Sequence, residues 1–252
     1  MGSIHRFSRS ELLLGQEGME RLYKARVAVF GIGGVGSYVA EGLARAGVGH
    51  FVLVDNDVVS LTNINRQLHS LTSTIGQQKT ALMKQRIMDI NPAAEVQIIN
   101  DFYLPDNADR FFVDRYDYVV DAIDTVAGKI SLAVECQKRQ LPIIASMGAG
   151  NKLDPARFEV ADIYKTSVDP LARVMRKKLK ENGVKKLKVV YSREEPRRIT
   201  LPADGQAEKK GSAGRTAPGS ISFVPSVAGL IIASEVVKDL TGDFGNKQGA
   251  DR

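Results

Sequence analysis

Glycine occupies four of the six positions from 31 to 36, and this segment constrains the fold more than any other. Residues 26–32 lead into it as a short run rich in β-branched and aromatic side chains, which predicts a strand buried on both faces. Residues 35–46 follow it, are rich in Ala, Val and Leu, and are closed by Gly47, which predicts a helix. A strand, a glycine turn and a helix in this order are typical of a nucleotide-binding unit, because glycine permits the tight turn and lets a ligand approach the backbone.

The rest of the first half of the chain repeats the alternation of strand and helix. Right-handed crossovers between parallel strands place helices on both faces of a sheet. The sequence therefore predicts an α/β fold with a doubly wound, mostly parallel sheet and a Rossmann-like nucleotide-binding half at 1–150. The further strands are predicted at 51–54, 96–99, 118–120 and 143–145, and the further helices at 77–90, 106–113 and 126–140.

The second half, 151–252, is less regular. A basic amphipathic helix is predicted at 170–180, and a glycine-rich stretch without apolar period predicts a flexible loop at 203–219. The apolar segment 223–240 is too short to span a bilayer, so we expect it to pack against the sheet. We expect the whole chain, 1–252, to form a single domain in which this half supplies the substrate-binding and C-terminal elements.

The composition excludes several classes of protein. With 43% hydrophobic and 25% charged residues, the chain is neither disordered nor a coiled coil nor collagen. Its one cysteine, Cys136, can form no internal disulfide, and no Cys-x-x-Cys pair is available for zinc. No apolar run reaches the roughly 18 residues of a membrane span, and the N-terminus lacks the layout of a signal peptide. We therefore expect a cytoplasmic protein.

The charge of the chain is uneven. Residues 165–215 contain 15 Lys or Arg against 6 Asp or Glu, which accounts for the whole basic excess of a chain with net charge +6. A positive surface of this kind attracts polyanions such as nucleic acid or anionic lipid. The alternative, a solvated face with surplus lysines, stays open. The candidates for contact with a polyanion are Arg173, Arg176, Lys177, Lys178, Lys180, Lys185, Lys186 and Lys188.

Polar side chains fall at or just beyond the ends of the predicted strands, where ligands of such sheets bind. Asp55 ends the second strand and is placed to accept hydrogen bonds from ribose hydroxyls, which up to this point makes an NAD-dependent dehydrogenase the default. A guanidinium and an ammonium together suit a triphosphate better than a pyrophosphate, which a helix N-terminus neutralises by itself. A carboxylate would then hold Mg²⁺ between phosphate oxygens. These side chains are Asp57, Asn63, Arg66 and Lys79, with Asp124 as the candidate magnesium ligand.

Four motifs occur in one order along the first half: Gly-x-Gly-Gly-Val-Gly-Ser, Asp-x-Asp-x-Val-x-x-x-Asn-x-x-Arg-Gln, Gly-x-x-Lys and Asp-x-x-Asp. Over residues 6–150 they resemble the ThiF/MoeB superfamily, the adenylating domains of ubiquitin-activating enzymes and their bacterial relatives. Residues 100–107, 148–155 and 165–172 resemble one branch of it, the tRNA threonylcarbamoyladenosine dehydratases, and carry the similarity to about residue 181.

The resemblance implies roles for the residues at matching positions. Gly33 and Gly34, beside the turn at Gly31, would approach the phosphates of ATP, and Asp55 would bind its ribose. The triphosphate would contact Asn63, Arg66 and Lys79, and Asp124 would hold Mg²⁺.

An N-terminal arginine in this superfamily reaches into the site of the neighbouring subunit. Arg9 fits that spacing, and Arg6 fits the dehydratase branch comparably well, so the assignment is open. A homodimer follows from this role.

Three further side chains have open roles. Cys136 lies on the apolar side of a predicted helix, which favours a core residue over a thioester-forming nucleophile. His69 either lies near the site or is a polar surface residue, and Asp121 either contacts the adenylate or has a structural role at a strand end.

The resemblance implies an ATP-dependent cyclisation of threonylcarbamoyladenosine in tRNA through an acyl adenylate, with release of AMP and pyrophosphate. Its implied partners are tRNA carrying this nucleoside and, in addition, proteins of a sulfur-carrier or cysteine-desulfurase system. The first alternative is an adenylyltransferase that activates the C-terminal carboxylate of a ubiquitin-like or sulfur-carrier protein, and the second is a module that senses NAD or ATP without catalysis. The basic segment favours the tRNA enzyme, because tRNA needs a broad positive surface.

Overall fold

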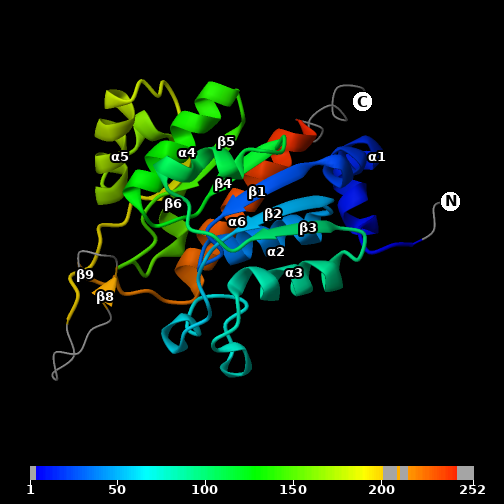
Figure 1. Ribbon diagram of the computed structural model, residues 1–252, viewed down its shortest axis with the longest axis horizontal. Helices are drawn as coiled ribbons and strands as arrows, with labels where there is room; N and C mark the ends of the chain where they lie inside the picture. Colours follow the sequence, from blue (N-terminus) through cyan, green and yellow to red (C-terminus); the bar gives the residue numbers. More distant parts are fainter. Residues whose placement is uncertain (1–3, 201–208, 211–214, 243–252) are drawn as a thin grey trace, which may run out of the picture.

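A central sheet of seven strands organises the computed structural model, which describes residues 4–200, 209–210 and 215–242 (Figure 1). The strands are β1 (Arg26–Phe30), β2 (His50–Val54), β3 (Glu95–Ile99), β4 (Tyr118–Asp121), β5 (Ile143–Ser146), β6 (Phe158–Asp162) and β7 (Lys188–Ser192). Their order is β3-β2-β1-β4-β5-β7-β6, and every pair is parallel except β6 with β7. The predicted α/β fold with a mostly parallel sheet is confirmed.

Helices cover both faces of the sheet (Figure 1). They are α1 (Ser8–Lys24), α2 (Gly36–Ala46), α3 (Lys79–Ile90), α4 (Val126–Arg139), α5 (Pro170–Glu181) and α6 (Phe223–Thr241), with 3-10 turns η1 (Leu61–Asn63), η2 (Thr72–Thr74), η3 (Pro105–Phe111), η4 (Pro155–Arg157) and η5 (Ile163–Lys165). Val27 and Val29 of β1 pack with α1, α2, α3 and α6, whereas Ala28 and Phe30 pack with α4 and η3 on the opposite face. Successive strand residues point to opposite faces, so a strand covered on both sides needs a continuous apolar run.

The strand order reverses beside β1. The chain runs from β1 to β2 and β3 on one side, and β4 and β5 lie on the other. Val29 of β1 is in register with Leu53 of β2 and with Val120 of β4. Ligands of open α/β sheets bind beyond the carboxyl ends of the strands at such a reversal, which directs attention to the loops that follow β1 and β4.

Some elements differ from the prediction. The predicted helix at 106–113 is the 3-10 turn η3. The strands β6 and β7 and the helix α1 were not predicted. Strand β6 was missed because it lies at the edge of the sheet, where Glu159 and Val160 are exposed and no continuous apolar run is needed. Helix α1 buries only Gly18, Met19 and Leu22, so it has little apolar periodicity.

The C-terminal helix behaves as predicted, because α6 packs on the sheet with Val224, Ala228 and Ile232 buried in its core. Of the loop expected at 203–219, residues 203–208 and 211–214 lie outside the described residues. The described part contains a short antiparallel pair, β8 (Lys209–Lys210) with β9 (Arg215–Thr216). No described helix is long and apolar enough to cross a membrane.

Candidate active site

The turn between β1 and α2 requires glycine at two positions. Gly31 has φ of 85°, and a Cβ atom there would lie 2.6 Å from the carbonyl oxygen of Ala122. A Cβ atom at Gly36 would lie 1.8 Å from the carbonyl oxygen of Gly31. The glycine turn is therefore pressed against the loop that follows β4, where the strand order reverses.

Of the next two glycines, Gly33 leaves room for a ligand, whereas Gly34 is closely packed by neighbouring side chains. A Cβ atom at Gly33 would meet only the amide nitrogen of Gln67, at 3.8 Å, and one at Gly34 would meet Pro225 and Arg66 at 3.3 and 3.5 Å. Helix α2 begins here without a side-chain cap and without an acidic residue in its first turn. The positive end of the helix dipole favours an anion at such an N-terminus.

Asp55 follows β2 and joins this turn. Its Oδ2 accepts a hydrogen bond from the backbone N–H of Ile32 at 2.6 Å, and its Oδ1 accepts one from the N–H of Asp57 at 2.8 Å. Burial raises the pKa of Asp55, while the charge of Lys79 and these two hydrogen bonds oppose the increase. Each carboxylate oxygen can accept a second hydrogen bond, which ribose hydroxyls can supply.

Lys79 is a buried cation with one exposed partner. It is the first residue of α3 and is 4% exposed, and its Nζ lies 2.7 Å from Oδ2 of Asp57, whose side chain is 60% exposed. An exposed carboxylate is already largely hydrated, so it can leave the ammonium at little cost in free energy when another anion binds there. A phosphate oxygen can therefore take the place of Asp57 on this ammonium.

Arg66 and Asn63 lie on the segment between β2 and α3. Arg66 donates from Nη1 to the carbonyl oxygen of Thr62 at 2.7 Å, while its Cγ lies against Gly34. Asn63 is buried, and its Oδ1 accepts from the backbone N–H of Ser60 at 3.1 Å. The two hydrogen bonds order the segment locally, and the Arg66 side chain is its contact with the glycine turn.

Two aspartates with different surroundings lie at the end of β4 and in the loop that follows it. Asp121 is fully buried and its Oδ1 accepts from Nζ of Lys129 at 2.8 Å, whereas Asp124 is exposed. Burial raises the pKa of Asp121, and the Lys129 ammonium opposes this increase. The structural alternative for Asp121 is thereby favoured over contact with an adenylate.

A magnesium site made by protein side chains alone is not formed in the described part of the chain, which holds no cluster of three His, Cys, Asp or Glu residues. Mg²⁺ is usually bound by one or two carboxylates together with phosphate oxygens. A single carboxylate at Asp124, beside a turn suited to phosphates, fits that pattern.

Helix α1 lies beside the amino end of β1, the opposite end of that strand from the glycine turn (Figure 1). Arg6 donates to the carbonyl oxygen of Ile90, at the end of α3, and Arg9 is exposed on α1. The α1 helix packs at the C-terminal end of α6, where Arg21 donates to the Thr241 carbonyl oxygen, whereas Pro225 near the other end of α6 contacts Gly34. The 19 residues of α6 span roughly 28 Å. Neither arginine reaches the glycine turn of its own chain.

Two side chains with open roles are buried. Cys136 is in the core, where burial raises the pKa of its thiol, so it is not a thiolate nucleophile. His69 is 5% exposed, which rules out the surface alternative. Gln67, the last residue of the Arg-Gln motif, faces Gly33 and was not among the predicted site residues. Only its position after Arg66 could have indicated it.

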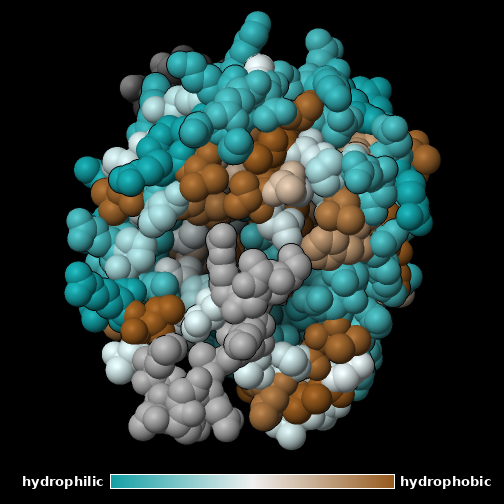
Figure 2. Space-filling model, turned by 60° about the vertical axis from the view of Figure 1, so that its left-hand side comes forward, coloured by the Kyte–Doolittle hydropathy of each residue, from teal (hydrophilic) through white to brown (hydrophobic). Residues whose placement is uncertain are grey.

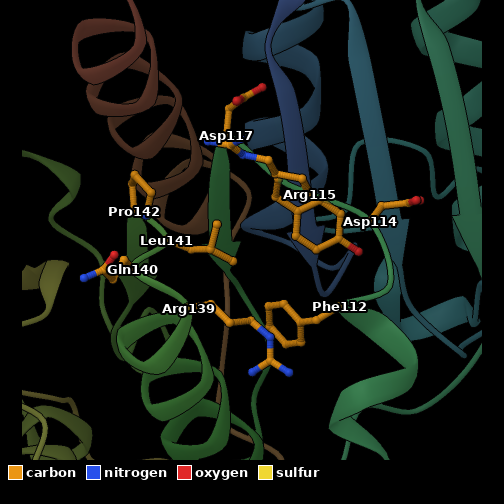
Figure 3. A pocket seen from close by; sticks show the side chains of 9 residues that line it. Phe112, Asp114, Arg115, Asp117, Arg139, Gln140, Leu141 and Pro142 are labelled. Atoms are coloured by element: carbon orange, nitrogen blue, oxygen red, sulfur yellow. The ribbon is translucent and has the colours of Figure 1, made fainter.

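A separate cavity of about 450 Å³ lies at the amino ends of β4 and β5, away from the glycine turn (Figure 3). In it the guanidinium of Arg139 lies 4.7 Å from the ring centre of Phe112. None of the predicted site residues lines this cavity.

The basic helix α5 begins at the carboxyl edge of the sheet, beside the end of β5. Asp169 caps its N-terminus by accepting from the Ala172 N–H at 2.8 Å, and its other oxygen lies 3.0 Å from Nζ of Lys152. Lys152 also donates to the carbonyl oxygen of Gly148, just after β5. The side chains of Ala172, Met175 and Leu179 are buried against the sheet side of the helix.

Some of the eight predicted contact residues have partners within the protein. Arg176 donates to the Thr166 carbonyl oxygen at 3.0 Å, and Lys178 pairs with Glu181 at 2.9 Å. Lys188 pairs with Glu235 at 2.8 Å, so part of its charge is offset within the protein. The remaining five are exposed. The side of the molecule that carries α5 comes forward in Figure 2, where hydrophilic residues cover the upper part of the face and hydrophobic ones gather below them. We call these five the α5 patch: Arg173, Lys177, Lys180, Lys185 and Lys186.

Comparisons of sequence and of structure with known proteins find relatives of one family. The family model described as the ThiF family matches residues 7–251. A Bacillus subtilis protein, tRNA threonylcarbamoyladenosine dehydratase, is 51% identical, and the alignment covers 99% of this chain and 100% of that protein. Crystal structures of Escherichia coli tRNA N6-threonylcarbamoyladenosine dehydratase, TcdA, in complex with ATP and with AMP match with TM-scores of 0.82 and 0.83 at 34% and 35% identity, each covering 93% of both chains.

Proposed function

The chain belongs to the ThiF family, and on this basis we propose that it is an ATP-dependent tRNA threonylcarbamoyladenosine dehydratase. The observation that carries the proposal is the convergence, at the reversal of strand order, of an open glycine turn with the buried Lys79 ammonium and the Asp55 carboxylate. This set suits a nucleoside triphosphate, because it offers a ribose acceptor, a helix N-terminus and a cation in sequence along one edge. The full-length similarity to the Bacillus subtilis dehydratase supports the choice of substrate.

The proposed roles of the site residues follow the geometry. Asp55 accepts hydrogen bonds from the ribose, and the backbone of Gly33 and Gly34 approaches the phosphates. Lys79 exchanges its partner Asp57 for a phosphate oxygen, because the lysine is buried while the Asp57 side chain is exposed to water. Arg66 adds a second cation beside Gly34. With Asn63 holding the loop, the two cations offset the charge of the triphosphate.

In the first step, the threonyl carboxylate of the modified adenosine attacks the α-phosphorus of ATP. A carboxylate oxygen forms a bond to phosphorus as the bond to the bridging oxygen of pyrophosphate breaks, which gives an acyl adenylate and free pyrophosphate. Negative charge grows on the departing pyrophosphate, and preorganised cations stabilise such charge most effectively where water is excluded. Lys79, almost fully buried, is the best placed residue for this role.

In the second step, the carbamoyl group of the same side chain attacks the activated carbonyl carbon. The bond to the adenylate oxygen breaks, AMP leaves, one proton is lost from the carbamoyl nitrogen, and a ring closes, so the nucleoside loses one water overall. An intramolecular attack of this kind has a high effective molarity and needs no protein nucleophile. The buried, protonated Cys136 is consistent with a route without a thioester.

Magnesium is a proposed cofactor, held by Asp124 together with phosphate oxygens. When bound, the ion would neutralise part of the triphosphate charge. Asp124 follows the loop that contacts Gly31, so its carboxylate belongs to the same edge of the sheet as the glycine turn.

The proposed function is tested by supplying ATP labelled in its α-phosphate. The chain should form AMP only when tRNA carrying threonylcarbamoyladenosine is present, whereas tRNA lacking the modification should give no AMP above background. AMP formation with a small ubiquitin-like or sulfur-carrier protein, and none with modified tRNA, would instead support the alternative adenylyltransferase.

A homodimer is proposed because the arginines of α1 and of the segment before it cannot reach the site of their own chain. Leu12 and Leu13 of this helix are 86% and 79% exposed, an apolar surface that a second copy can cover. In a twofold dimer the same segment of each subunit contacts the other, so each could complete the neighbouring site.

This arrangement predicts complementation between inactive variants. One subunit carries Arg6→Ala and Arg9→Ala, and the other carries Asp124→Ala. Random mixing should produce about a quarter of wild-type activity, because half of the dimers are mixed and each has one intact site of two. The measurement is the rate of AMP formation before and after mixing the two unfolded and refolded proteins. Activity no greater than that of the separate variants, or a fully active monomer, would refute completion in trans.

The tRNA is proposed to lie on the α5 patch. The helix begins at the carboxyl edge of the sheet through Asp169 and Lys152, so its exposed cations extend from the neighbourhood of the nucleotide site. Phosphate contacts of this kind position a nucleic acid without reading its sequence.

Charge reversal of this patch should weaken tRNA binding and leave ATP binding unchanged. In a triple variant with Arg173, Lys177 and Lys180 changed to glutamate, the slope of log affinity against log salt should become shallower by about 0.7–0.9 for each phosphate that the protein no longer neutralises. A control with the same charge change carries glutamate at Lys24, Arg110 and Arg115, which are exposed on α1, on η3 and in the loop before β4. Equal slopes in wild type and the α5 variant would show that the patch is only a solvated surface.

The remaining expectations follow from the substrate. With a tRNA substrate, the protein is expected to act in the cytoplasm. Contact with a sulfur-carrier or cysteine-desulfurase protein is a further proposed partnership, which a pull-down with purified candidates would test.

A further inference from the structure

Val168, in the loop between η5 and α5, is held in a backbone conformation that its side chain disfavours. Its φ is 63°, a left-handed value that is a genuine outlier for a β-branched residue. The N–H of Asp169 donates to the carbonyl oxygen of Ser167 at 2.6 Å, across Val168, and so closes a γ-turn at residues 167–169. The form of this turn with positive φ is rare and strained.

Buried contacts on both sides of the γ-turn impose this conformation. Asp169 is 1% exposed, accepts from the Ala172 N–H and pairs with the buried Lys152. On the other side Thr166 is 8% exposed, and its carbonyl oxygen accepts from Nη1 of Arg176 at 3.0 Å. A strained residue persists only where its surroundings over-determine it, and such residues concentrate at active sites and ligand clamps.

The tip of the γ-turn is exposed although both of its anchors are buried. Val168 is 41% exposed, and Ser167 is exposed as well. Burial of the valine side chain therefore offsets the strain only in part in the free protein. Glycine or asparagine would adopt the same φ with less strain. A valine at this position is explained if its side chain becomes fully buried in a complex.

The γ-turn lies at the carboxyl edge of the sheet, beside the candidate active site. Oδ2 of Asp169 lies 3.1 Å from the position of a Cβ atom on Gly148, the second residue after β5. Strand β5 is paired in parallel with β4, and Ala122, the residue after β4, contacts the turn at Gly31. Asp55 follows β2, on the other side of β1. The strand order therefore places Asp55 and the γ-turn on opposite sides of the glycine turn.

We propose that the Val168 side chain packs against the base of the modified adenosine, so that the γ-turn is a specificity element for the tRNA substrate. ATP bound on the β2 side leaves the β5 side open to the substrate that attacks its α-phosphorus. The α5 patch begins one helical turn after Val168, so a tRNA backbone on that patch would bring an unpaired base to the tip. Base faces pack well on apolar side chains. This inference rests on the proposed function, since it adds a residue to the binding of the same substrate.

Val168→Gly in the full chain tests the proposal, because it relieves the strain and removes the side chain together. The melting temperature without ligands should equal that of the wild type or be higher. The KM for modified tRNA in AMP formation should rise roughly fivefold or more, the effect of losing partial burial of a valine side chain. The kcat should stay within about twofold, because the base contact is the same in the ground state and in the transition state. ATP affinity, measured by calorimetry, should be unchanged.

Three further variants separate the base contact from a loosening of the loop. Val168→Ile keeps an apolar β-branched side chain and should keep KM within about twofold of the wild type. Val168→Asn keeps a side chain that adopts positive φ more readily but is polar, so its KM should rise as in the glycine variant. Gln140→Gly is the matched control, because Gln140 has φ of 54° at the end of α4, at the amino edge of the sheet. Its KM should not change.

The possible results distinguish the base contact from the proposed function. An unchanged KM in both Val168→Gly and Val168→Asn, while the wild type forms AMP with modified tRNA, would refute the contact and leave the proposed function standing. A lower melting temperature with a fall in kcat and no change in KM would show that the γ-turn has only a structural role. A wild-type chain that forms no AMP with modified tRNA would overturn the proposed function and the contact together. If Val168→Gly does not fold, Val168→Asn carries the same comparison with Val168→Ile.

Discussion

Replacing Lys79 with alanine is expected to slow pyrophosphate release by at least a hundredfold, roughly the effect of removing a preorganised electrostatic group. Lys79 is 4% exposed, so its interaction with a phosphate is little weakened by water. The protein should stay folded, because the carboxylate left behind, Asp57, is 60% exposed and returns to solvent at little cost.

The measurement is the initial rate of pyrophosphate release with ATP and modified tRNA at saturation. Lys84→Ala, on the same helix α3, is the matched control and should keep the wild-type rate. A rate for Lys79→Ala within a few-fold of the wild type would place the reacting phosphates elsewhere.

Breaking the buried pair of Lys129 and Asp121 is expected to have the largest effect on stability. Both side chains are at most 1% exposed, and their atoms are 2.8 Å apart. Lys129→Met leaves a buried carboxylate without its cation, which costs about 3–5 kcal/mol. For a chain of this length the melting temperature should fall by roughly 10 °C. The loop that contacts Gly31 and leads to Asp124 would lose its anchor, so activity should fall in parallel.

A double variant, Lys129→Met with Asp121→Asn, removes both charges and should recover most of the stability. Lys178→Met, which breaks the exposed pair with Glu181, is the control and should change stability by less than about 1 kcal/mol. A Lys129→Met protein that melts at the wild-type temperature would contradict the importance of the pair for folding.

The sequence predicted the nucleotide-binding half of the fold well because its strands are buried on both faces. Each of β1, β2 and β4 is a short continuous apolar run, and the glycine turn marks the boundary between β1 and α2. The edge strand β6 was missed for the opposite reason, since an edge exposes side chains and its apolar residues do not form a run. The sequence of the second half shows no regular alternation of strand and helix, because its core joins residues from segments far apart in the chain, such as α4, α5 and β7.

The site was predictable to the extent that spacing fixes position. Asp55 directly follows β2, and Arg66 and Lys79 lie on the segment that leads from β2 to the first residue of α3, at the carboxyl edge of the sheet. The burial of His69 could not be predicted, because it results from the folding of the whole segment and not from its local sequence. Whether Arg6 or Arg9 completes a site depends on a second copy of the chain, about which a single sequence contains no geometric information.

The mass of the product nucleoside decides whether the carboxylate that ATP activates is the one on the tRNA. The chain would be incubated with ATP, Mg²⁺ and tRNA carrying threonylcarbamoyladenosine, and the tRNA would then be digested to nucleosides for mass spectrometry. We predict that the modified nucleoside becomes lighter by one water, and that one AMP forms for each nucleoside converted. A nucleoside of unchanged mass after AMP has formed would exclude the dehydratase, because ATP would then be activating a carboxylate other than that of the tRNA.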